Sequence, residues 1–168
     1  KKNELIKNSN ARDGDLLLLT KPLGTGILYN ALKKGLASSD DFYQAIESMV
    51  ELNKEIGSSL HKFNVHAATD VTGYGLIGHL YEMCKSSNVS AEIETNKVHF
   101  FNNVEQFAKK GAVPGGTGRN LEFYSKHIKF ADSIKNHQKL MLADAQTSGG
   151  LLISLSEKDA HLLFSFYK

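Results

Sequence analysis

HAATDVTGYGLIGH, residues 66 to 79, is the stretch of this sequence that decides its fold. It predicts a strand over residues 65–71, a turn rich in glycine, and then a helix that continues through Leu80 and Met83. Glycines in such a turn let the backbone approach a ligand closely, and the free N–H groups that begin a helix favour bound anions. The stretch therefore predicts a strand–turn–helix unit with a candidate ligand site at the end of the strand.

Outward from this unit, strands and helices alternate along the chain. Further strands are expected over residues 15–20, 89–93, 140–144 and 151–155, and the first of them, a run of leucines, is expected to be buried. Helices are expected to begin at Gly24–Gly26 and end near Gly35, to begin at Ser39–Asp40, and to span residues 100–109 and 157–167. This interleaving favours a sheet layered with helices over an all-α or all-β fold.

Length and composition indicate one ordinary globular domain. The chain has 168 residues, of which 41% are hydrophobic and 23% are charged. The net charge of +2 argues against a nucleic-acid-binding surface, which is usually strongly basic. The single cysteine, Cys84, excludes an internal disulfide and is compatible with a reducing compartment. We find no targeting or membrane-spanning segment, so we expect a cytoplasmic protein that binds neither membrane nor nucleic acid.

Both ends of the sequence suggest a piece of a longer protein. The chain opens at Lys1 without an initiator methionine, and it ends on the apolar helical pattern of Leu162, Leu163, Phe164 and Phe166. Natural termini usually fray into polar residues. We therefore expect further chain beyond these 168 residues.

Asp70 is the candidate metal ligand. A carboxylate at the end of a strand can bind a hard cation such as Mg²⁺, which prefers oxygen ligands and keeps phosphate oxygens in its shell. Asp70 would then hold the cation that neutralises charge on phosphates. The alternative is that Asp70 only caps the helix that follows the glycine turn.

The same turn contains the spacing of a dinucleotide-binding fingerprint. Gly73, Gly75 and Gly78 form Gly-x-Gly-x-x-Gly, and Glu92 and Glu94 follow at about the distance of a ribose-binding acid. Against this interpretation, Thr69, Asp70 and Thr72 are polar where a central parallel strand should be almost continuously apolar. A dinucleotide-binding module remains the alternative function.

Two other segments have the composition of ligand-binding loops. Residues 113–120 are expected to form a glycine-rich loop that contains Gly115, Gly116, Thr117 and Asn120. Residues 144–150 form a turn with Thr147, Ser148 and Gly149, and lead into a strand. Such loops are also common as plain connections, so each is weak evidence on its own.

The residues indicate no self-sufficient active site. Cys84 falls inside a predicted helix, where it is expected to be a small core residue. The histidines lack the spacing of a zinc site, and neither a Gly-x-Ser-x-Gly motif nor a Walker loop is present.

Taken in order, four segments resemble the selenide, water dikinase (selenophosphate synthetase) family over nearly the whole chain. They lie at residues 14–26, 68–80, 114–120 and 144–152. The run LTKPLGTG at residues 19–26 also separates this family from its relative, aminoimidazole ribonucleotide synthetase. Ala145 stands where the family usually has proline, which would loosen that turn. The family also leads us to expect a closing strand that this sequence does not contain, so the sheet edge is expected to be incomplete.

The resemblance implies the fold of the aminoimidazole ribonucleotide synthetase C-terminal domain, which is α+β with a mixed β-sheet layered with helices. Residues 1–168 would be a single C-terminal domain of a longer enzyme whose N-terminal ATP-binding catalytic domain is absent here. That enzyme uses ATP and Mg²⁺ to make selenophosphate from selenide, and it releases AMP and phosphate. Its partners would be its own N-terminal domain and, through that domain, a second copy in a homodimer.

The resemblance also implies how the work is divided between the two domains. The aspartate that matches Asp70 joins aspartates of the N-terminal domain in binding Mg²⁺ at an interdomain ATP site. The reactive cysteine or selenocysteine and the essential lysine belong to the N-terminal domain, so this chain contains no catalytic residue and is expected to be inactive alone. The nucleotide-site loops would comprise Thr72, Gly73, Gly75, Gly115, Gly116, Thr117, Asn120, Thr147, Ser148 and Gly149.

One structural expectation tests the shared site. If these loops flank one ATP site, Asp70 should be solvent-accessible beside the other two loops and free of ion pairs with lysine or arginine. A purely structural domain, whose loops shape a partner's site without binding ligand, is the remaining alternative.

Overall fold

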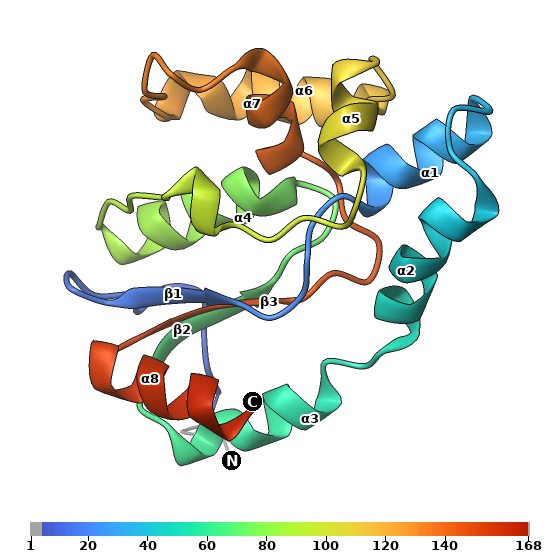
Figure 1. Cartoon of the computed structure of the whole chain (residues 1–168). Coiled ribbons are helices and arrows are strands. Elements are labelled where there is room, and N and C mark those ends of the chain that lie inside the picture. The colour runs from blue at the N-terminus through green and yellow to red at the C-terminus, as the bar shows by residue number, and fades with distance from the viewer. Residues whose placement is uncertain (1–4, 168) are drawn as a thin grey trace.

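A three-stranded sheet lies at the centre of the molecule, with the strand order β1-β3-β2 (Figure 1). The structure, a computed structural model, describes residues 5–167. The strands are β1 (Leu16–Leu19), β2 (Val65–Asp70) and β3 (Leu151–Leu155), and both outer strands pair antiparallel with β3. A parallel pairing occurs at the isolated bridge between Leu23 and Phe100. The predicted α+β fold is confirmed.

Helices cover both faces of this sheet (Figure 1). On one face lies α4 (Gly75–Ser87), and beyond it an outer layer of α5 (Val104–Lys109), α6 (Gly115–Tyr124) and α7 (Asn136–Leu142). On the other face lie α3 (Lys54–Ser59) and α8 (Glu157–Phe166), while α1 (Thr25–Lys33) and α2 (Ser39–Val50) flank the sheet. Short 3₁₀ turns occupy Leu60–Lys62, Thr95–Lys97 and Ser125–His127. No helix within residues 5–167 has the length and apolar character needed to span a bilayer.

The hydrophobic core is divided among these layers. One cluster joins the sheet to α4 and includes Val71, Met83 and Leu152. A second joins α1 to α5 and α7, and a third joins the sheet to α8 through Ile153 and Leu163. Each large apolar side chain buried in this way contributes about 1.5–3 kcal/mol. The sheet and α4 therefore form a rigid base for the turn that joins them.

Local sequence signals set several helix ends. Ser38 accepts a hydrogen bond from the Asp41 N–H, and the Asp41 carboxylate accepts one from the Ser38 N–H, so α2 begins with a capping box. Ser156 caps α8 in a similar way. Gly35 has a φ of 68°, which explains why the helix α1 ends there as predicted.

The structure corrects two predicted segments in the outer layer. Residues 113–120 are not a loop, because the helix α6 begins at Gly115 directly after Pro114. The proline fixes the entry to the helix, and the buried side chains of Thr117 and Tyr124 hold it in place. Residues 140–144 are not a strand either, because Met141 and Leu142 are buried on the helix α7.

Three further predictions fail near the sheet. Residues 89–93 form no strand, because they have no strand partner within the described residues. The helix expected over residues 100–109 begins only at Val104, after Asn103 adopts a left-handed conformation with a φ of 64°. The leucine run is the strand β1, as predicted, but none of its residues is buried, because β1 lies at the edge of the sheet.

A buried polar cluster ties the three strands together. Asp15 accepts hydrogen bonds from the hydroxyl of Ser154 on β3, at 2.6 Å, and from Nδ1 of His66 on β2, at 2.8 Å. Burial alone would raise the pKa of Asp15, but these hydrogen bonds and one from the Arg12 N–H lower that pKa overall. The cluster fixes the entry to β1 and is accounted for by this structural role.

Candidate functional site

Asp70 ends the strand β2, and its side chain is exposed. No lysine or arginine within residues 5–167 forms an ion pair with it, as the shared-site argument requires. The chain then turns through Thr72 and Gly73 into α4. Asp70 therefore presents a free carboxylate at the end of a rigid strand.

The turn at Thr147–Gly150 lies against the Asp70 turn. The N–H of Val71 donates to the carbonyl of Gly150 at 2.8 Å, and the N–H of Gln146 donates to the carbonyl of Thr72 at 3.0 Å. A Cβ at Gly149 would overlap the carbonyl oxygen of Val71, so only glycine allows the two turns to approach this closely.

The helix α6 completes the group. The Asn120 side chain donates to the carbonyl of Gly73 at 2.8 Å and to the carbonyl of Ala143 at 3.2 Å. Thr117 donates its hydroxyl to Asp144 at 2.8 Å. These contacts bring the three predicted segments together on one side of the molecule, and their roles in binding remain predictions.

The predicted site residues differ in how available they are to a ligand. Asp70, Gly73, Gly115, Thr147 and Ser148 are exposed, and Thr72 and Gly116 are half-buried. Three others have structural roles: Gly75 and Gly149 are buried under neighbouring backbone, and Thr117 is fully buried. Asn120 is half-buried, and its amide already binds two carbonyls.

Backbone conformation supports a specialised turn. Gly75 has a φ of 69°, and a Cβ there would lie 2.6 Å from the carbonyl of Ala143. Ser148 also has a positive φ, 48°, although it carries a side chain. Such conformations are uncommon outside glycine and persist only where the surroundings enforce them.

Lys21 enforces the position of Ser148. Its side chain is buried, and Nζ donates to the carbonyls of Ser48 at 2.8 Å, Glu51 at 2.6 Å and Ser148 at 3.1 Å. Burial lowers the pKa of the Lys21 ammonium. Lys21 therefore ties the C-terminal end of α2 to the turn that contains Ser148.

Asp144 and Gln146 join the same region to α1. Asp144 is completely buried and accepts hydrogen bonds from Thr117 and from the N–H of Ile27, at 3.1 Å. Burial raises the pKa of Asp144 to about 6. The Gln146 side chain accepts hydrogen bonds from the N–H groups of Gly24 at 3.0 Å and Thr25 at 3.2 Å.

His79 is hydrogen-bonded to the turn that follows Asp70. Its Nε2 accepts a hydrogen bond from the N–H of Thr72 at 3.1 Å, so the ring is neutral in this arrangement. Burial lowers the pKa of His79, which favours the neutral form. The sequence analysis assigned no role to His79, Lys21, Asp144 or Gln146. The signal that could have identified them is that all four lie inside the quoted motifs.

The geometry of the sheet argues against a dinucleotide-binding site at Gly73, Gly75 and Gly78. A dinucleotide site of that type lies in a parallel sheet, whereas β2 pairs antiparallel with β3. A Cβ at Gly78 would lie 2.6 Å from Cβ of Tyr74 and 2.7 Å from the Tyr124 ring, so this glycine is required for packing. Glu94 pairs with Lys97 at 2.6 Å on the surface.

The described part of the chain contains no complete set of metal ligands. The residues between 5 and 167 contain no group of three or more His, Cys, Asp or Glu side chains placed to hold an ion. Asp70 alone fits as one oxygen ligand of a hard cation that keeps several waters or phosphate oxygens.

Residues 12–165 match the family described as AIR synthase related protein, C-terminal domain. The chain belongs to this family. It is 40% identical over 161 residues to the selenide, water dikinase of Clostridioides difficile, covering 96% of this chain and 46% of that protein. It is 39% identical over 165 residues to the selenide, water dikinase of Pseudomonas straminea, covering 98% of this chain and 46% of that protein. The chain thus spans about half the length of these relatives.

Solved structures share the fold at low sequence identity. A thiamine-monophosphate kinase from Stenotrophomonas maltophilia superposes with a TM-score of 0.65 at 14% identity, covering 98% of this chain and 46% of that chain. The hydrogenase maturation protein HypE in complex with ATP superposes with a TM-score of 0.66 at 17% identity, covering 95% of this chain and 39% of that chain. Both are longer proteins in which this fold forms one part.

Proposed function

We propose that this chain is the C-terminal half of an enzyme that makes selenophosphate from selenide and ATP and releases AMP and phosphate. It would supply one wall of an ATP site that its N-terminal domain completes. The observation that carries the proposal is the exposed, unpaired Asp70, placed beside two further loops by specific backbone contacts. The identity of about 40% to selenide, water dikinases supports the choice of reaction.

Asp70 would contribute one oxygen ligand to Mg²⁺. The other ligands would come from the N-terminal domain, from water and from the phosphates of ATP. When bound there, the ion would neutralise charge on the phosphates that are transferred.

The remaining candidate residues divide into two groups by exposure. Gly73, Gly115, Thr147 and Ser148 would offer backbone N–H groups or hydroxyls to phosphate oxygens at the surface of the site. The partly or fully buried residues would hold these loops in register: Thr72, Gly75, Gly116, Thr117, Asn120 and Gly149. The exposed hydroxyls and glycines are thus the part of the site that should affect nucleotide binding directly.

The same proposal extends to the location, oligomeric state and partners of the complete enzyme. The enzyme would be cytoplasmic and would form a homodimer through its N-terminal domain, with no nucleic acid or membrane as partner. This chain would contact selenide and ATP only in the complete enzyme, because no group of three or more His, Cys, Asp or Glu side chains within residues 5–167 is placed to hold a metal ion.

A chimeric enzyme tests the proposed reaction. This chain would replace the matched half of the Clostridioides difficile selenide, water dikinase, and ³¹P NMR would follow selenide-dependent conversion of ATP to selenophosphate, AMP and phosphate. We expect turnover by the chimera and none by the 168-residue chain alone. ATP turnover that co-purifies with the isolated chain would contradict the proposal, as would a folded chimera that binds ATP but makes no selenophosphate.

A further inference from the structure

The Thr72 N–H connects the strand that carries Asp70 to the helix α4. Nε2 of His79 accepts a hydrogen bond from this N–H at 3.1 Å, and among the described residues it is the only acceptor of that group. The carbonyl of Thr72 accepts hydrogen bonds from the N–H groups of Gln146 and Gly75, both at 3.0 Å. Thr72 is thus held on one side by backbone and on the other by a single side chain, two residues after Asp70.

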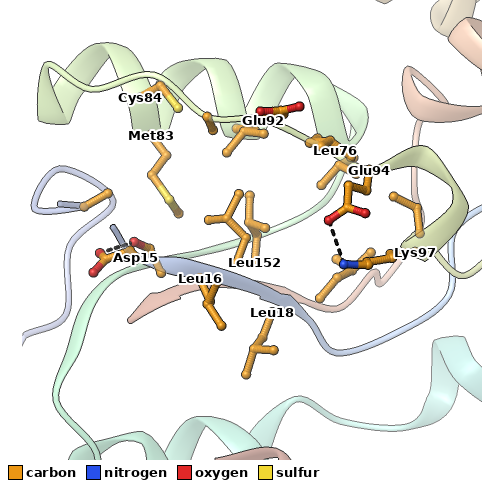
Figure 2. Close-up of a pocket in the computed structure, with 18 of the residues that line it drawn as sticks. Asp15, Leu16, Leu18, Leu76, Met83, Cys84, Glu92, Glu94, Lys97 and Leu152 are labelled. Atoms are coloured by element: carbon orange, nitrogen blue, oxygen red, sulfur yellow. Dashed lines mark hydrogen bonds and ion pairs between the residues drawn. The ribbon is translucent and has the colours of Figure 1, made fainter. Parts of the chain in front are cut away.

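The core holds the His79 ring in place. His79 is buried in the second turn of α4, and its ring centroid lies 5.6 Å from that of Tyr74. The helix α4 packs on the sheet through a hydrophobic cluster that includes Met83 and Leu152, and Figure 2 shows Met83 extending from α4 toward the sheet. Close-packed interiors have low compressibility and transmit displacements. The packing of α4 on the sheet therefore sets the position of Nε2 and, through it, that of the Thr72 N–H.

The same nitrogen determines what the Thr72 hydroxyl can do. Nε2 accepts the Thr72 N–H, so it carries no proton, and the proton of the neutral ring is on Nδ1. Oγ1 of Thr72 lies 3.3 Å from Nε2 and can therefore only donate in this contact. A hydroxyl that donates in one direction keeps its oxygen lone pairs for other donors or for a cation. Thr72 is half-buried, so part of the residue that His79 orients is open to solvent.

His79 is coupled to the candidate site by charge as well. A polar ring taken from water into the core costs free energy unless it finds hydrogen-bond partners. The other buried histidine of the described residues, His66, bonds to Asp15 at the start of the sheet. His79 bonds to a residue of the candidate site instead. Burial, the larger effect, lowers the pKa of His79, and the negative charges of Glu82 and Asp70 raise it.

We propose that His79 is a positioning residue of the proposed metal site: by holding the amide and hydroxyl of Thr72, it keeps the Asp70 carboxylate in one arrangement toward the cation. Pairing with Leu151 of β3 fixes Asp70 from one side, and the bonds of Thr72 fix the chain that follows it. His79 itself touches neither the cation nor ATP. This inference rests on the proposed function, because it depends on Asp70 as a ligand of Mg²⁺.

Loss of the His79 acceptor should weaken Mg²⁺ binding more than it slows the reaction. Removing a group that orients a metal ligand typically costs about 10–100-fold in metal affinity or activity. His79→Leu keeps a side chain of similar size and removes the acceptor. In the chimeric enzyme it should raise the half-saturating Mg²⁺ concentration about tenfold or more, with turnover at saturating Mg²⁺ within about threefold of that of the unsubstituted chimera.

Conservative variants separate positioning from packing. His79→Gln places a carbonyl oxygen near the position of Nε2, so it should accept the Thr72 N–H and restore the Mg²⁺ dependence. His79→Asn carries the same amide on a side chain that is too short, and it should behave like His79→Leu. His161→Leu, at an exposed position of α8, is the matched control and should change nothing. If His79→Leu fails to fold, the comparison of His79→Gln with His79→Asn decides the question.

NMR of the isotopically labelled 168-residue chain tests the positioning itself, without ATP or Mg²⁺. The ¹⁵N signals of the His79 ring should be those of the tautomer with its proton on Nδ1. His79→Leu should speed hydrogen exchange of the Thr72 amide about tenfold or more, because this N–H loses its acceptor. It should also average the three-bond couplings that report the χ1 angle of Asp70. His79→Gln should restore both quantities.

The proposal is overturned if His79→Leu leaves the Thr72 exchange and the Asp70 couplings unchanged, or if His79→Gln and His79→Leu raise the half-saturating Mg²⁺ concentration equally. Lower turnover at saturating Mg²⁺ with an unchanged Mg²⁺ dependence would also overturn it, because a packing defect would then be responsible. An unsubstituted chimera that makes no selenophosphate would contradict the proposed function, and the NMR measurement would still decide whether His79 positions Asp70. Normal turnover of that chimera, with unchanged NMR signals in His79→Leu, contradicts this inference alone.

Discussion

At the scale of single residues, the polar side chains around the candidate site are either exposed to solvent or buried in hydrogen bonds within the fold. Asp70 is exposed and unpaired, whereas Asp144 is completely buried and bonded to Thr117 and Ile27. Both are aspartates in glycine-containing motifs, and only their surroundings separate them. The buried aspartate holds the loops together, and the exposed one is accessible, as its proposed role as a metal ligand requires.

Asp144→Asn should change how stability depends on pH. Burial raises the pKa of Asp144 from 3.8 to about 6, so the folded chain holds this proton more tightly than the unfolded chain does. The stabilisation from this group is therefore fully present below pH 3.8 and is lost as pH rises through 6. Between pH 5 and pH 7 the wild-type free energy of unfolding should fall by about 1 kcal/mol relative to that of the variant.

Urea unfolding of both proteins at several pH values measures this difference. Subtracting the variant removes groups common to both, including His79, whose lowered pKa acts in the opposite direction. If the difference between the two free energies of unfolding stays constant from pH 5 to pH 7, burial does not raise the pKa of Asp144.

Thr117→Val should destabilise the fold although the two side chains have the same shape. The change removes the hydroxyl that donates to Asp144 and accepts from the Ala145 N–H, leaving buried groups without partners. The cost should be about 1–3 kcal/mol in the free energy of unfolding. Thr147→Val, at an exposed position, is the matched control and should cost less than about 0.5 kcal/mol. Equal effects would contradict the structural role of Thr117.

Sequence alone could single out Asp70 as a candidate ligand at the end of a strand, because a carboxylate between a strand and a glycine turn is a visible pattern; its role as a ligand stays a prediction. It could not separate Thr117 from Thr147, because both are threonines in glycine-containing segments. The difference is that Thr117 is in the first turn of α6, directed at a buried carboxylate 27 residues later in the chain.

At the scale of secondary structure, the strand–turn–helix unit over β2 and α4 was predictable because its signals are local. The apolar residues of β2 and α4 have the right periods, and the glycines mark the turn. Residues 113–120 were mistaken for a loop because glycine is a poor helix former. Tertiary contacts through Thr117, Asn120 and Tyr124 override that preference.

Lys21→Met should loosen the connection between α2 and the Ser148 turn. Three carbonyls lose the ammonium that bonds them, at the end of α2 and at Ser148. We expect a loss of about 2–3 kcal/mol in the free energy of unfolding and faster amide exchange in residues 147–150. Lys33→Met, on the exposed face of α1, should change neither quantity. Unchanged exchange in the turn would show that Ser148 holds its conformation without Lys21.

At the scale of the whole molecule, three segments distant in sequence meet beside one carboxylate. Composition and charge predicted one domain, and the motif order predicted its family, because both are properties of the sequence as a whole. Which loops touch could not be derived from the sequence, since the decisive contacts join residues such as Asn120 and Gly73 across the fold. The grouping agrees with a site that a second domain completes.

The direct test of that account is the Mg²⁺ dependence of turnover in the chimeric enzyme with Asp70→Asn. The amide removes one negative charge from the proposed metal shell, so turnover at limiting Mg²⁺ should fall by about a hundredfold or more. The isolated variant chain should keep its unfolding midpoint, because Asp70 is exposed, and Asp132→Asn, another exposed aspartate, should leave turnover unchanged. Near-normal turnover by Asp70→Asn at limiting Mg²⁺ would contradict the account and leave Asp70 as only a turn residue.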